Sequence, residues 1–177
     1  MGQASIRFFG IRGIQANTEY YVCMVPLSVL SKLFIFSDTE LPPSIRSQRI
    51  LNKARIPEIK RYILQNRDAY VFSALTASVD GDIVFKPVDS EKQHKSLGEI
   101  EISVNTRIVI NDGQHRKAAI DAALAECPEL KYEDIAVVLF PDPGLKRSQQ
   151  IFSDLNRYAI RPTKSINILY DLRDPFA

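Results

Sequence analysis

The stretch RIVINDGQHRKAAIDAALAE, residues 107–126, decides the fold of this chain. Residues 107–110 are a short β-branched run with the composition of a buried strand. Asn111, Asp112 and Gly113 follow, a tripeptide typical of a turn that also supplies a helix cap. From Gln114 onward, alanine and leucine recur at helical spacing. The stretch therefore predicts a strand, a tight turn and a helix in direct succession.

The first turn of that helix is a candidate anion site. Its backbone N–H groups have no partner inside the helix, and the helix dipole leaves partial positive charge there. Gly113 would let a ligand approach the backbone, Arg116 adds a planar fork suited to phosphate, and His115 is expected to donate a hydrogen bond to it. The candidate phosphate or nucleotide site comprises Asp112, Gly113, Gln114, His115 and Arg116. An alternative of equal weight on local grounds is that Asp112 caps the helix while Arg116 pairs with it or with Asp121.

The pentapeptide DGQHR at 112–116 resembles the signature of the DGQHR-domain proteins. It is similar to the Gly-Glu-Arg-Arg-type motif of ParB and the Gly-Cys-His-Arg motif of sulfiredoxin, which share one fold. Together with SQQIFSDLN at 148–156 and LYDLRD at 169–174, it makes the chain resemble the DndB family of DNA sulfur modification proteins, from about Gly13 to the C-terminus. The resemblance implies an α+β fold of the ParB/sulfiredoxin type, a small mixed sheet with flanking helices.

A second motif, SDLNR at 153–157, is similar to the Glu-Asn-Leu-Gln-Arg segment of ParB. That resemblance implies nucleotide contacts from Asp154, Asn156 and Arg157. The motif's glutamate, which helps to hold metal, is Ser153 here, so a metal ligand is missing unless Asp154 replaces it. Sulfiredoxin chemistry is excluded because its nucleophilic cysteine corresponds to Gln114.

The two motifs make physical sense together. Arg116 and Arg157, on separate helices, could clamp one phosphate, and Gln114 and Asn156 could read base or ribose edges. The competing interpretation of the second motif is a helix-end network in which Asp154 and Asn156 bond to Arg157 and Arg161.

Basic residues gather in two parts of the sequence, although the net charge is only +2. Residues 44–67 hold seven lysines and arginines against a single acid, Glu58, and a second basic group lies at 146–164. Acids concentrate instead at 80–89 and 121–134. Such segregation predicts a nucleic-acid-binding face, whereas the alternative is that the basic helices are merely solvated. The candidate DNA-binding residues are Arg46, Arg49, Lys53, Arg55, Lys60 and Arg61.

Hydrophobic periodicity and turn residues predict the remaining elements. Strands are expected at 18–25, 69–77, 97–104 and 135–140, and a hairpin turn at 80–82 before a strand at 83–85. Helices are expected at 27–36, 145–158 and 163–172, with two short helices on either side of Pro57.

A chain of 177 residues has the length of one domain. We expect a single domain over 1–177, and since DndB-like proteins are generally longer, it is expected to be the N-terminal part of a longer protein. No apolar run approaches the length of a membrane span. Two lone cysteines fit neither a disulfide framework nor a zinc pattern, so a reducing, cytoplasmic setting is expected. Cys23 is expected to be a small buried hydrophobe, with a reactive thiol as the minority alternative.

Three functions follow from these patterns. The favoured one is a DNA-binding regulator, because resemblance to DndB implies repression of a phosphorothioation gene cluster by direct binding to double-stranded promoter DNA. The second is a ParB-like nucleotide hydrolase or DNA nickase that uses both motifs. The third and weakest is an adaptor that binds only other proteins of a modification complex. No catalytic residue or metal site is assigned; the resemblance allows a nucleoside triphosphate with Mg²⁺ as cofactor. The resemblance also allows two further kinds of partner, other phosphorothioation proteins and a second copy of the chain.

Overall fold

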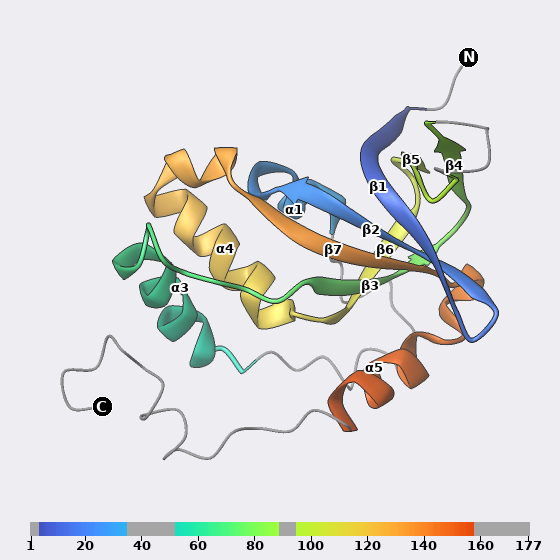
Figure 1. Cartoon of the computed structure of the whole chain (residues 1–177). Helices are drawn as coiled ribbons and strands as arrows, with labels where there is room; N and C mark the ends of the chain where they lie inside the picture. The colour runs from blue at the N-terminus through green and yellow to red at the C-terminus, as the bar shows by residue number, and fades with distance from the viewer. Residues whose placement is uncertain (1–3, 35–51, 89–94, 158–177) are drawn as a thin grey trace.

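The computed structural model describes residues 4–34, 52–88 and 95–157. At its centre lies a seven-stranded mixed sheet with the strand order β4-β5-β1-β2-β7-β3-β6 (Figure 1). The strands are β1 Ser5–Gln15, β2 Thr18–Pro26, β3 Leu75–Asp80, β4 Ile83–Pro87, β5 Leu97–Ser103, β6 Arg107–Asp112 and β7 Asp134–Pro141. All neighbours are antiparallel except β3 and β7, which run parallel. The predicted α+β fold with a mixed sheet and flanking helices is confirmed, while its ParB/sulfiredoxin type stays a prediction.

The sheet curls so that its two ends approach each other. β3 and β4 pair with β6 and β5 respectively, and only Gly81 and Asp82 separate β3 from β4. At this junction a Cβ on Gly81 would lie 3.0 Å from the Thr106 side chain, between β5 and β6. The strands β3 and β4 therefore follow one another along one side of a long, bent two-stranded ribbon, and β5 and β6 along the other side. This ribbon contributes both ends of the strand order.

Four helices are described: α1 Leu27–Leu33, α3 Arg55–Gln65, α4 Gln114–Glu126 and α5 Ser148–Arg157. Two short 3-10 helices, η2 Pro128–Tyr132 and η3 Pro143–Leu145, connect elements. Helix α4 buries Ala119, Ile120 and Ala123 in the core, and α3 packs along α4. The small side chains of Ala119 and Ala123 let α4 lie close to its neighbours.

Helices α3 and α4 run in the same direction. Near their starts, the backbone N–H of Asn52 donates to His115 Nε2 at 2.9 Å. Further along, Lys60 Nζ lies 2.6 Å from Glu126 Oε2 at the end of α4. Both N-termini consequently lie at one end of the pair and both C-termini at the other (Figure 1).

Several predicted boundaries are wrong, for identifiable reasons. The expected strand at 69–77 begins only at Leu75. The Tyr70 and Phe72 rings pack on each other, and Phe72 also packs on Tyr62 of α3, so this aromatic pattern serves a helix contact and not a strand. The hairpin at 80–82 does not form, because β3 pairs with β6 and β7 and β4 pairs with β5.

The helices show similar differences. Pro57 is not the boundary of a helix; α3 begins at Arg55, and Pro57 lies in its first turn, where no intrahelical N–H bond is lost. The helix expected from Leu145 begins at Ser148, because Gly144 and Leu145 have positive φ angles of 73° and 54°. The rest of the expected helix at 27–36, the helix before Pro57 and the helix at 163–172 lie wholly or partly outside the described residues.

Candidate nucleic-acid interface

The signature turn is tighter than its sequence indicates. Asn111 and Asp112 belong to β6, and Gly113 alone makes the turn, with a left-handed φ of 95° at the N-cap of α4. No side chain caps this helix, so Asp112 is not the expected cap. A Cβ on Gly113 would collide with the Leu75 side chain and lie 3.1 Å from Arg116 Nη2. Gly113 is therefore required by the packing of the protein itself, whatever ligand approaches it.

Arg116 is bonded to the protein through both terminal nitrogens. Its Nη2 lies 2.5 Å from Asp112 Oδ2, and its Nη1 donates to the carbonyl oxygens of Ser73, at 2.5 Å, and Ala74, at 3.1 Å. The Ser73 hydroxyl is a further partner, and the arginine side chain is only 15% exposed. This is the arrangement that the pairing alternative predicted. A phosphate bound by Arg116 would compete with Asp112 for this guanidinium.

His115 connects the two parallel helices. Its Nε2 accepts the N–H of Asn52, so the ring is a neutral acceptor on that side, and the expected donation from His115 to a phosphate stays a prediction. Burial lowers the pKa of His115, and the nearby positive charge of Arg55 lowers it further. The contact holds the start of α3, with Lys53 and Arg55, against the first turn of α4.

Three other predicted phosphate-site side chains form hydrogen bonds to residues four positions away in the sequence. Gln114 Nε2 donates to the carbonyl of Ile110 at 3.3 Å, and Asn156 Nδ2 donates to that of Phe152 at 2.7 Å. Asp154 Oδ1 accepts a 2.6 Å hydrogen bond from Gln150.

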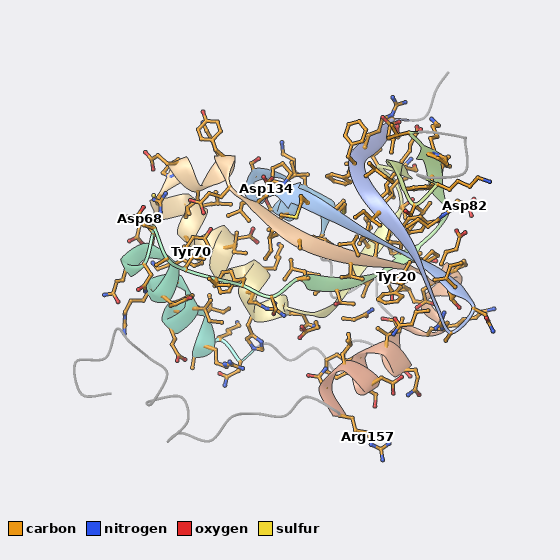
Figure 2. The ribbon with its side chains drawn as sticks, in the orientation of Figure 1. Tyr20, Asp68, Tyr70, Asp82, Asp134 and Arg157 are labelled. Atoms are coloured by element: carbon orange, nitrogen blue, oxygen red, sulfur yellow. The ribbon has the colours of Figure 1, made fainter. Side chains whose placement is uncertain are left out.

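The second motif occupies the exposed last turns of α5. Figure 2 shows Arg157 at the end of this helix, pointing away from the sheet. The clamp between Arg116 and Arg157 remains a prediction, and the Arg161 part of the helix-end network lies outside the described residues.

The strand before the first motif and the helix that carries the second are instead joined by a buried network that the sequence does not predict. Asn111 is fully buried; its Nδ2 donates to Ser78 Oγ at 2.7 Å, and its Oδ1 accepts from Ser148 Oγ at 2.8 Å. The network ties β6 to β3 and to the start of α5. The serines lie 33 and 37 residues from Asn111 in sequence, so no local pattern could have revealed the pairing.

The described basic candidates differ in availability. Lys53, Arg55 and Arg61 are exposed, whereas Lys60 forms its ion pair with Glu126. Lys53 and Arg55 stand where the positive ends of α3 and α4 meet, so side-chain charge and both helix dipoles add at one place. Arg46 and Arg49 lie outside the described residues.

A metal or nucleotide centre gains no support from the described residues. Among them, no group of three or more histidine, cysteine or acidic side chains is placed to hold a metal ion. The signature side chains that would bind a triphosphate, Gln114, His115 and Arg116, already have protein partners. Within the same residues, no helix is long and apolar enough to cross a membrane. Cys23 is buried, as predicted.

Comparison with known proteins gave one match. The model of the family described as DndB, DNA-sulfur modification-associated, matches residues 8–177. No curated protein and no solved structure matches the chain.

Proposed function

Because the chain belongs to the DndB family, whose members are associated with DNA sulfur modification, we propose that it is a DNA-binding repressor of a bacterial phosphorothioation gene cluster. The proposal places it in the cytoplasm, on double-stranded promoter DNA. The observation that carries it is the basic end of the α3/α4 pair, where exposed Lys53 and Arg55 lie beside two helix N-termini.

This end suits a DNA backbone in three respects. Lysine and arginine neutralise phosphates, and the dipoles of α3 and α4 add positive charge at the two helix starts. The hydrogen bond from Asn52 to His115 fixes the two helix starts relative to each other, so that they would present one preformed surface. Arg61, on the side of α3 away from buried Ile63, extends the positive charge along the helix. These contacts supply affinity and register; they do not specify which bases are recognised.

The nucleotide-hydrolysing or nicking alternative is not favoured by any contact in the structure. Arg116 is bonded to Asp112, Ser73 and Ala74, and the side-chain amides of Gln114 and Asn156 donate to the carbonyls of Ile110 in β6 and Phe152 in α5. Measuring ATP or GTP turnover alongside DNA binding tests this alternative.

The experiment measures binding of the purified chain to labelled duplex DNA from the promoter of its own gene cluster. Wild type is compared with the double variant Lys53→Ala/Arg55→Ala and with a matched control, Lys32→Ala/Lys131→Ala, which removes two exposed charges from α1 and η2. The first variant should weaken binding at least tenfold and the control less than twofold.

A reporter gene behind the same promoter supplies the second readout. Repression should be lost with the Lys53/Arg55 variant and kept with the control. Equal DNA affinity in all three proteins would refute the proposed surface. ATP or GTP turnover by wild type, in the absence of DNA binding, would establish the enzyme alternative in its place.

A further inference from the structure

A pocket of about 430 Å³ lies at the other end of the α3/α4 pair, away from Lys53 and Arg55. It is formed by the segment 67–72 after α3, the first three residues of β7, and side chains from β2, α1 and α4. Figure 2 shows Asp68 and Tyr70 beside the end of α3 and Asp134 at the start of β7. Part of the wall is apolar, including Phe72 and the exposed side chain of Val71.

The charges in the pocket favour a cation. Among the described residues that line the pocket, Arg67 alone is basic, and it is bonded to Glu133 Oε1 at 3.3 Å and to the Cys127 sulfur. Tyr70 donates its hydroxyl proton to the same glutamate. Asp68 and Asp134 are exposed, and no ion pair with either is found in the described part of the chain. After Arg67 and Glu133 cancel, two negative charges remain, which would repel phosphate.

The start of β7, beside the pocket, has a strand edge that no other described strand pairs with. Leu27 N donates to the Glu133 carbonyl at 2.8 Å, so the odd-numbered residues of β7 turn their backbone groups towards β2. The even-numbered residues then face β3, as the bond from Asp142 N to the Val79 carbonyl confirms. The β3–β7 ladder begins only at the pair Leu75–Val137. The N–H of Ala136 and the carbonyl of Asp134 consequently face the pocket ahead of that ladder.

We propose that this pocket binds an extended segment of a partner protein that carries one arginine or lysine side chain. The segment adds to the open edge of β7 through Ala136 N–H and the Asp134 carbonyl. Its cation is held by Asp68 and Asp134, while its aliphatic stem lies against Val71 and Phe72. The volume is at the lower end of the range for ligand pockets and suits one long side chain and its backbone.

Fluorescence anisotropy with a labelled peptide, acetyl-Thr-Val-Thr-Arg-Val-Thr-amide, tests the proposal on the full chain. Binding should weaken about tenfold or more in Asp68→Asn/Asp134→Asn, since each carboxylate contributes up to about fivefold. The matched control is Asp82→Asn, an exposed acid between β3 and β4, which should change nothing. Thermal melting of each variant verifies folding.

Two further peptides distinguish the contribution of the arginine charge from that of the backbone hydrogen bonds to β7. Replacing the arginine by glutamine, or methylating the backbone nitrogens of its neighbours, should each weaken binding at least about tenfold. The proposal is overturned if the labelled peptide does not bind, or if the glutamine peptide or the Asp68/Asp134 variant binds as well as its parent. Equal binding of the methylated peptide, with displacement by spermidine, would show a site for free amines instead and also overturn it. These outcomes do not depend on whether the chain binds DNA.

Discussion

Gly113 and Arg116 act as one packing unit at the turn between β6 and α4. The missing Cβ of Gly113 leaves room for Leu75 and the guanidinium of Arg116, and Arg116 in turn bonds to Asp112, Ser73 and Ala74. An arginine in the first turn of a helix opposes the helix dipole, which at sequence level favours an anion ligand. Here the protein supplies its own anion, and the pentapeptide alone could not show which acid would be chosen.

Substituting this glycine should be costly. Gly113→Ala should lower the free energy of unfolding by about 2–4 kcal/mol, because it combines an unfavourable φ with a collision at Leu75. The matched control is Gly144→Ala, where φ is also positive but the nearest atom would be 3.7 Å away, so a cost of only about 1 kcal/mol is expected. Urea unfolding measures both. Equal losses would show that the space beside Gly113 is unimportant.

Cys23 should make stability depend on pH in alkaline solution. Burial raises the pKa of its thiol to about 12, against about 8.5 in an unfolded chain. Between these values the unfolded state loses a proton that the folded state keeps, so the free energy of unfolding falls by about 1.4 kcal/mol per pH unit. Unfolding of Cys23→Ala should therefore depend less steeply on pH between pH 9 and 11 than that of wild type. Rapid alkylation of Cys23 in the folded protein at pH 8 would contradict this account.

At the scale of elements, the buried Asn111 network decides where α5 lies. Asn111 is the only fully buried asparagine among the described residues, and its bonds to Ser78 and Ser148 hold β3, β6 and α5 together. A buried polar group is costly unless it is bonded, so each member depends on the other two.

Removing one hydroxyl tests that dependence. Ser148→Ala removes the buried hydrogen bond that Ser148 Oγ donates to Asn111 Oδ1 and should cost about 1–3 kcal/mol. Ser153→Ala, an exposed position on the same helix, should cost less than about 0.5 kcal/mol. Chemical denaturation gives both values, and proteolysis within α5 should accelerate only in the first variant. If Ser148→Ala leaves the free energy of unfolding unchanged, other contacts must determine the position of α5.

Many of the strands and helices could be predicted because each depends on a local sequence pattern. The strand and helix of the signature, the alternation of β5 and the apolar runs of β2 and β7 are all found where the sequence places them. The strand order was beyond reach, since β3 pairs with β7 across a long stretch of chain. For the candidate site, the sequence predicts which residues belong to it but not which partner each side chain contacts. Whether Arg116 meets phosphate or Asp112, and whether Lys60 meets DNA or Glu126, depends on tertiary geometry that spacing does not encode.

The whole molecule has opposite charge at the two ends of the α3/α4 pair. Lys53 and Arg55 stand at the helix starts, whereas Asp68 and Asp134 stand around the pocket near the helix ends. A net charge of only +2 hides this separation. The arrangement would orient the protein with its basic end on DNA and leave the acidic pocket free for a basic segment of a partner.

The salt dependence of DNA binding tests the central claim most directly. For wild type and Lys53→Ala/Arg55→Ala, the logarithm of the association constant is measured against the logarithm of salt concentration on one duplex. Each lost phosphate contact reduces the slope by about 0.9, so the variant should show a slope smaller by about 2. Lys32→Ala/Lys131→Ala should keep the wild-type slope. A variant slope equal to that of wild type, or no DNA binding by wild type at low salt, would contradict the account.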